Sequence, residues 1–115
     1  MARNKRKARN EFRYNFSTKH MNYVFEEDGK NYHSLGLTTK RYTRGKRNLY
    51  MKNMPLSINP KKNDNRKSYI RFGIISQNKK SFANKTDKRF KFSKDDYFNV
   101  KSKIRNYKKY RKKRS

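Results

Sequence analysis

The chain contains no cysteine and no tryptophan, and only 8 of its 115 residues are acidic. Without cysteine it has no disulfide, no thiolate nucleophile and no cysteine-ligated zinc site. Its two histidines, His20 and His33, are too few for a histidine-rich metal site, and the carboxylates are scattered along the sequence. We therefore expect neither a bound metal nor another cofactor.

Long apolar runs are also missing. No stretch approaches the ~18 apolar residues of a membrane-spanning helix, and no apolar segment follows the basic N-terminus to make a secretory signal. A helix that lies on a membrane surface usually carries a Trp- or Leu-rich face, but Trp is absent and Leu is scarce here. The sequence therefore predicts a cytoplasmic protein with no membrane partner.

Aliphatic residues are few, and the core must be built from something else. Hydrophobic residues make up 30% of the chain, and such a low share with a high net charge is typical of disorder. Aromatic residues, however, reach 15%, with nine Tyr and eight Phe, and disordered chains are poor in aromatics. We expect one small folded domain with a thin core of rings.

Positive charge dominates what is present. Lys and Arg number 35, which gives a net charge of +27, and such a potential attracts phosphate backbones. An acidic protein is an alternative partner, but the charge is spread over the whole chain rather than gathered in one patch. Nucleic acid is therefore the predicted partner. RNA is favoured over DNA because of the ring content and because no helix that reads a DNA groove is recognisable.

The predicted fold class is α+β, with a small, mostly antiparallel sheet and one long C-terminal helix. Alternating rings at Phe12, Tyr14 and Phe16 predict a short strand. A β-hairpin is predicted within residues 20–39, around the Asp28-Gly29 dipeptide, which favours a type I′ turn or a bulged relative. Residues 69–75 are the most β-prone run and are predicted to form the central strand, and residues 88–92 another strand.

The helix is predicted from its start signals and its periodicity. Ser93 fits an N-cap with Asp95 and Asp96 in the first turn. Apolar residues then recur at helical spacing, at Tyr97, Val100, Ile104 and Tyr107. The domain organisation that follows is a basic N-terminal arm (1–10), a single nucleic-acid-binding domain (11–107) and a basic C-terminal tail (108–115), with both extensions flexible.

Residues 38–67 are predicted to form a long, positively charged irregular segment. Pro55 and Pro60 exclude a regular helix or a central strand there, and long ordered loops in small domains are often functional. We expect phosphates to be bound mainly from this segment and from the strand after it, by Arg44, Lys46, Arg47, Lys61, Lys62, Arg66, Lys67 and Arg71.

Catalysis, if present, must work without a metal. The chain has no phosphate-binding glycine loop, no HExxH motif and no nucleophile elbow. Attack of an RNA 2′-hydroxyl on its neighbouring phosphate needs only a base or acid of near-neutral pKa and cations around the phosphate. His20, next to Lys19, is the candidate catalytic residue, and His33 is a weaker one.

Parts of the sequence resemble small basic proteins of plasmids, phages and conjugative elements of low-GC Gram-positive bacteria. The stretches that carry the resemblance are KHMNYVFEEDGKNYHSLGLT (19–38), NMPLSINPKKNDNRKSYIRFGI (53–74) and KRFKFSKDDYFNVKSKIRNYKK (88–109). That family has no well-defined activity, so the resemblance implies a mobile genetic element rather than a reaction. An analogy to the barnase/EndoU/RelE group of RNases rests on an early histidine, a basic sheet and a flanking helix, without a matching catalytic set.

Three functions remain open at this point. The first is a non-enzymatic protein that binds nucleic acid, RNA in preference to DNA. The second is a metal-independent RNase, or an anti-CRISPR-type inhibitor acting on guide RNA or on the nucleic-acid path of the effector. The third is a ribosome-associated protein, because ribosomal proteins share the charge, the thin core and the basic extensions.

Overall fold

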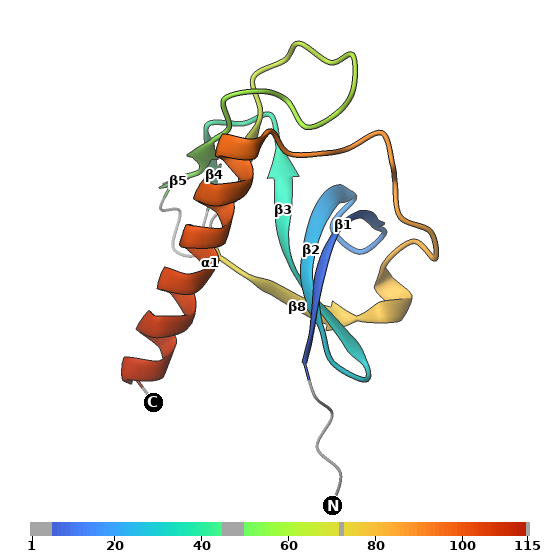
Figure 1. Cartoon of the computed structure of the whole chain (residues 1–115), viewed down its shortest axis with the longest axis vertical. Coiled ribbons are helices and arrows are strands. Elements are labelled where there is room, and N and C mark those ends of the chain that lie inside the picture. The colour runs from blue at the N-terminus through green and yellow to red at the C-terminus, as the bar shows by residue number, and fades with distance from the viewer. Residues whose placement is uncertain (1–5, 45–49, 72, 115) are drawn as a thin grey trace, which may run out of the picture.

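Three long antiparallel strands, β1 (Lys7–Asn15), β2 (His20–Glu27) and β3 (Asn31–Thr38), form the frame of a six-stranded sheet. The computed structural model describes residues 6–44, 50–71 and 73–114 (Figure 1). The other elements are β4 (Tyr42–Arg44), β5 (Tyr50–Lys52), β6 (Met54–Pro55), β7 (Tyr69–Ile70), β8 (Ile75–Asn78), the 3₁₀ turn η2 (Lys79–Ser81) and α1 (Lys94–Arg114). The predicted α+β class with a mostly antiparallel sheet and one C-terminal helix is confirmed.

The sheet and the helix take in parts of both basic extensions. β1 begins at Lys7 and α1 ends at Arg114, so residues 7–10 and 108–114 lie in regular secondary structure. Residues 1–5 and Ser115 lie outside the described residues.

The predicted hairpin is confirmed as β2 and β3, but its turn differs from type I′. The described residues with positive φ are Lys19, Asn63 and Gly73, whereas a type I′ turn needs positive φ at both central positions. Instead, the carboxylate of Asp28 closes the turn by accepting hydrogen bonds from the N–H groups of Lys30 (3.0 Å) and Asn31 (2.8 Å). An Asx-type side-chain contact therefore takes the place of left-handed backbone.

The central strand is β3, and the prediction that residues 69–75 fill this role is wrong. β3 pairs with β2 on one edge, and on the other edge with both β7 and β8. The β-prone run is interrupted at Gly73, whose φ of +80° is a conformation that few other residues adopt. The interruption leaves two short strands that lie along successive parts of the same edge of β3.

Two further segments differ from their predictions. Residues 38–67 are not wholly irregular, because they contain the β4–β5 hairpin and β6, although residues 56–67 have no helix or strand beyond an isolated bridge. Residues 88–92 do not form a strand. They lie against residues 60–62 through a single bridge between Lys61 and Phe90 and through flanking backbone hydrogen bonds.

The N-terminus of α1 follows the prediction and adds one contact. The hydroxyl of Ser93 accepts a hydrogen bond from the N–H of Asp96 (3.2 Å), as an N-cap does. The carboxylate of Asp96, 2% exposed, accepts hydrogen bonds from the N–H groups of Ser57 and Ile58. Asp96 therefore ties the irregular 56–67 segment to the first turn of the helix.

The core lies on both faces of the hairpin. Tyr23, Phe25 and Leu35 face α1 and pack with Val100 and Ile104 of its apolar stripe. A smaller cluster, formed by Val24, Tyr32 and Phe82, lies on the opposite face. Figure 1 shows α1 beside the sheet, with its first turn near the end of β3. The predicted stripe of the helix is thus confirmed at its central positions.

The outer edge of β1 is covered by a segment from the last third of the chain. Ala83 donates a backbone hydrogen bond to the carbonyl of Tyr14 and Asp87 donates one to that of Phe12, each at 2.8 Å. The guanidinium of Arg13, nearly buried, donates to the carbonyls of Ala83 (2.9 Å) and Asn84 (2.8 Å). The edge strand is in this way shielded from pairing with other chains.

Candidate nucleic-acid interface

The acidic residues are concentrated where β2 meets β3, which we call the turn end of the hairpin. Glu26 pairs with Arg6 (3.0 Å) and Lys108 (2.5 Å). Burial alone would raise the pKa of Glu26, but the hydrogen bond and charge of Lys108, with help from Arg6, leave that pKa below its usual value. The negative charge of Glu26 is therefore engaged in ion pairs within the fold.

Glu27 shows the same arrangement on the other face. Its carboxylate pairs with Lys79 (3.0 Å) and with Arg9 (2.9 Å), and hydrogen bonds from these two cations lower its pKa. Lys79 is also anchored against the smaller core cluster, because it lies over the ring of Tyr32. The four cations that contact Glu26 and Glu27 are thus held in ion pairs within the fold.

His33 belongs to the turn end and to a buried polar chain. Its Nε2 lies 3.0 Å from the carboxylate of Asp28, and its Nδ1 lies 2.6 Å from the hydroxyl of Ser76 on β8. The same residue types form hydrolytic triads, but His33 and Ser76 are direct cross-strand partners, and neither lines a cavity described below. The contacts connect the turn to β8, so we assign them a structural role.

The opposite end of the hairpin, where β2 begins and β3 finishes, is its open end and holds a cavity of about 400 Å³. We call it the cationic cavity. Four Lys or Arg side chains and His20 line it, against a single carboxylate, Asp64. The other lining residues are polar, small or apolar. The full lining is Lys19, His20, Met21, Leu37, Thr38, Thr39, Lys40, Asn59, Lys61, Asp64, Arg66, Ser68 and Phe90.

The one carboxylate of this cavity does little to offset its charge. Asp64 forms a 2.7 Å ion pair with Arg66, whose side chain is 69% exposed. Hydrogen bonds from the Arg66 side chain and backbone lower the pKa of Asp64 to about 2. Asp64 is thus ionised at neutral pH, but its charge is shared with Arg66. Lys19, Lys40 and Lys61 make no ion pair within the described residues.

His20, the predicted catalytic residue, lies at the open end next to Arg71. The pKa of His20 is lowered first by burial and then by the positive charges of Arg71 and Lys40, while a backbone interaction with Leu37 opposes these effects. The Arg71 side chain reaches this position across Gly36. A Cβ on Gly36 would lie 3.0 Å from Cδ of Arg71, so a larger residue at position 36 would force the Arg71 stem to shift away from β3.

Lys19 has an unfavourable backbone conformation. It follows the β1–β2 turn, donates its N–H to the carbonyl of Asn15 (2.8 Å) and has a φ of +61°. Residues other than Gly, Asn and Asp seldom adopt this region, and such strain concentrates at binding and catalytic sites. A lysine at this position places a cation on the cavity at a conformational cost.

The structure brings together only some of the predicted site residues. His20, Lys61 and Arg66 line the cationic cavity, and Arg71 lies beside His20. Lys62 and Lys67 are exposed on the same irregular segment, outside the lining, and Arg44 is exposed on β4. Lys46 and Arg47 lie outside the described residues.

Sequence reasoning missed Lys40 and did not place Lys19 among the phosphate-binding residues. Both line the cationic cavity. The hairpin pattern contained the necessary signal, because antiparallel pairing brings the residue before β2 and the residues after β3 to the same edge. The prediction chose residues by their type and by their position in a loop. It did not use the strand register of the hairpin to find which residues meet at its open end.

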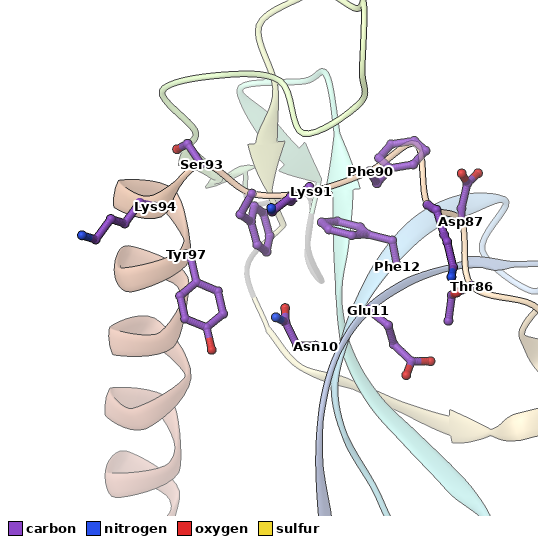
Figure 2. Close-up of a pocket in the computed structure, with 12 residues that line it drawn as sticks. Asn10, Glu11, Phe12, Thr86, Asp87, Phe90, Lys91, Ser93, Lys94 and Tyr97 are labelled. Atoms are coloured by element: carbon purple, nitrogen blue, oxygen red, sulfur yellow. The ribbon is translucent and has the colours of Figure 1, made fainter.

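A second cavity of about 770 Å³ lies on the other side of Phe90, which lines both. We call it the aromatic cavity, because Phe12, Phe90, Phe92 and Tyr97 contribute to its lining. Figure 2 shows Tyr97 extending from the first turn of α1 toward Asn10, with Phe12 and Phe90 on the opposite side. The remaining lining residues are Asn10, Glu11, Thr86, Asp87, Lys88, Lys91, Ser93 and Lys94.

Across the described ranges, no three His, Asp or Glu side chains gather into a group that could bind a metal ion. No helix in the same part of the chain has both the length and the apolar character needed to cross a membrane.

Comparisons with protein-family models, with curated proteins and with solved structures found no match to this chain. What the interface does must therefore be argued from its own residues.

Proposed function

We propose that this protein binds nucleic acid, and RNA in preference to DNA, through the cationic cavity at the open end of the β2–β3 hairpin. One observation carries the proposal: the cations at the two ends of the hairpin differ in whether they are paired with carboxylates. Carboxylates at the turn end are paired with cations, whereas Lys19, Lys40 and Lys61 converge on a cavity with one carboxylate. A concave cationic surface concentrates the field on a phosphate backbone.

Polar side chains in the cavity lining support binding of a nucleic-acid backbone rather than of a single small anion. Thr39 is an exposed hydroxyl residue of the lining, and hydroxyl groups commonly contact phosphate and sugar oxygens. The exposed cations Lys62 and Lys67 extend the surface along the 56–67 segment. A strand lying along this segment would meet several cations in succession, which suits a polymer.

The test is direct binding to a labelled single-stranded RNA of about 12 nucleotides, measured by fluorescence anisotropy. We expect the affinity to fall steeply with salt, by about 10³–10⁵-fold between 50 and 200 mM if six to ten phosphates are contacted. DNA of the same sequence should bind more weakly. Absence of binding to both polymers in low salt, together with tight binding to an acidic polypeptide, would overturn the proposal.

A second function, metal-independent cleavage of RNA, is favoured by the position of His20 beside Arg71. Its lowered pKa leaves the imidazole neutral at pH 7 and able to accept a proton. In such a step the 2′-oxygen attacks phosphorus as His20 takes the 2′-hydroxyl proton. The P–O5′ bond then breaks, a 2′,3′-cyclic phosphate forms, and the departing 5′-oxygen takes a proton from water. The Arg71 guanidinium would stabilise the phosphorane charge.

Cleavage and simple binding are separated by incubating labelled RNA with the protein in EDTA. Cleavage to a cyclic phosphate that is lost in His20→Gln, while RNA affinity is kept, would show an enzyme. Intact RNA with the wild-type protein would exclude this second function and leave the binding proposal untouched. Sequencing the RNA that co-purifies from cells then tests whether a guide RNA or ribosomal RNA is the target.

A further inference from the structure

We propose that the aromatic cavity binds one unpaired base of the strand whose backbone lies across the cationic cavity, which makes single-stranded nucleic acid the preferred ligand. This inference rests on the proposed function and names its ligand class more narrowly. The volume of about 770 Å³ is within the range of small-molecule sites, and the mixture of rings with a few polar groups is typical of them.

The two cavities are neighbours because one stretch of chain separates them. Phe90 contributes to both linings. Phe90 also bridges to Lys61, and Lys91 donates its backbone N–H to the carbonyl of Pro60 (2.9 Å). Residues 60–62 and 89–91 therefore form a fixed partition, and a chain of nucleotides can hold a phosphate on one side of it and a base on the other.

The rings that line the cavity come from β1, from the irregular segment before α1 and from α1 itself. Phe12 and Phe92 are nearly buried and pack edge-on at 5.0 Å, which fixes the floor of the cavity. Tyr97 and Phe90 are only partly buried and stand above this floor. Base stacking on exposed rings accepts every base, because each base has a π-face.

Asn10 is held so that its amide can contact the edge of a base. Its side-chain oxygen accepts a hydrogen bond from the hydroxyl of the fully buried Tyr23 (3.0 Å). Burial raises the pKa of Tyr23, so the hydroxyl stays protonated and donates. The amide's orientation is thereby fixed, and its NH₂ group has no partner among the described residues, leaving two donors for a base oxygen or nitrogen.

The charges around the aromatic cavity favour a nucleotide over a neutral aromatic ligand. Its two carboxylates are already paired: Glu11 with Arg9 and Arg13, and Asp87 with Arg89 at 2.6 Å. Figure 2 shows the Glu11 carboxylate directed away from the rings. Lys88 and Lys91 are exposed lining residues that make no ion pair within the described part of the chain, and they can contact the phosphates flanking the base.

The test compares three variants against a matched pair of ligands. Tyr97→Leu removes the ring but keeps apolar volume, Tyr97→Phe keeps the ring, and Phe98→Leu removes a neighbouring ring that is 57% exposed and outside the lining. The ligands are a single-stranded RNA of about 12 nucleotides and the same oligomer made abasic. Circular dichroism confirms that each variant is folded.

We expect Tyr97→Leu to weaken binding of the base-containing RNA by about 5- to 150-fold, the range for one stacked base. Tyr97→Phe and Phe98→Leu should bind like the wild type. The abasic oligomer should bind the wild type more weakly and should not distinguish the variants. Equal affinity for abasic and base-containing oligomers, or unchanged RNA binding by Tyr97→Leu, would overturn the base site while leaving backbone binding intact.

A further experiment, NMR of the Tyr and Phe ring protons, distinguishes binding of a base within a strand from binding of a free nucleotide. Titration with AMP should shift the Tyr97 resonances at high ligand concentration only, and ribose 5-phosphate should leave them unchanged. AMP binding that is tighter than RNA binding would overturn the assignment to a strand. If none of the polymers binds in low salt, the proposed function itself has failed.

Discussion

The two ends of the β2–β3 hairpin differ in how their cations are paired, although both belong to the same pair of strands. At the turn end, Glu26 and Glu27 each contact two cations, and Asp28 contacts His33. At the open end, three lysines face a cavity whose only carboxylate is paired with Arg66. In a protein of net charge +27, three of the eight acidic residues thus tie cations and His33 into the fold at one end, while Lys19, Lys40 and Lys61 make no ion pair within the described residues at the other.

The most direct way to break this contrast is to reverse charge at one end only. Lys40→Glu with Lys61→Glu takes the net charge from +27 to +23, and so does Lys30→Glu with Lys80→Glu, at exposed positions near the turn end. We expect the first pair to lower RNA affinity on the order of 100-fold in moderate salt, and the salt slope by about 2. The second pair should have only a small effect.

Equal losses of affinity in the two double variants would show that net charge alone drives binding. The location of the interface at the open end would then be wrong. Anisotropy titrations at matched salt concentrations decide between these outcomes, and urea unfolding checks that neither pair has disrupted the fold.

Substitutions at the turn end should lower the stability of the fold and leave the RNA affinity nearly unchanged. Glu27→Gln removes the charge that holds Lys79 and Arg9, and we expect a loss of about 1.5–3 kcal/mol in the free energy of unfolding, as for other hydrogen bonds to charged groups. Its RNA affinity should stay close to that of the wild type.

Asp64→Asn at the open end should instead raise RNA affinity, because among the described residues Asp64 supplies the one carboxylate that lines the cationic cavity.

Proton binding at His20 gives a further test of the open end. Because the pKa of His20 in the folded state is below its usual value of 6.5, its contribution to stability is present above pH 6.5 and is lost as the pH falls through the lowered pKa. A bound phosphate should raise that pKa. RNA affinity should therefore increase on going from pH 7.5 to 5.5, by about tenfold for each unit of pKa change. A pH profile that is unchanged in His20→Gln would contradict a phosphate beside this residue.

The smallest expected effect concerns the backbone strain at Lys19. Lys19→Gly relieves a left-handed conformation that costs other residues roughly 1–2 kcal/mol, and this gain is partly offset by the greater freedom of glycine when unfolded. We expect thermal stability to be unchanged or slightly higher, while RNA affinity falls by a few fold. A variant that loses stability would show that Lys19 has a structural role rather than a binding one.

Local signals predicted those parts of the fold that local interactions decide. The hairpin followed from a turn dipeptide between apolar runs, and the helix from Ser93 and the recurrence of Tyr97, Val100 and Ile104. The position of β3 as the central strand could not be predicted in this way. Its sequence contains Asn, Ser and Gly, which are poor strand formers, and its burial depends on three partner strands.

The interface was predictable to the extent that it depended on residue type. Choosing basic residues in an irregular segment identified Lys61 and Arg66, and choosing the histidine beside a lysine identified His20. The aromatic cavity was not predictable, because it joins Asn10 and Phe12 to residues 86–97 through packing across most of the chain. Its rings could not be distinguished from core rings without that packing.

The cover on the outer edge of β1 has a consequence for synthesis. β1, β2 and β3 are complete once residue 38 has been made, but the N–H groups that meet Phe12 and Tyr14 belong to residues 83 and 87. At ordinary rates of translation, β1 waits roughly 2–10 s for its cover, and an open strand edge invites pairing with neighbouring nascent chains. During that interval, mutual repulsion between these strongly basic chains would keep them apart, so the charge that serves binding would also protect folding.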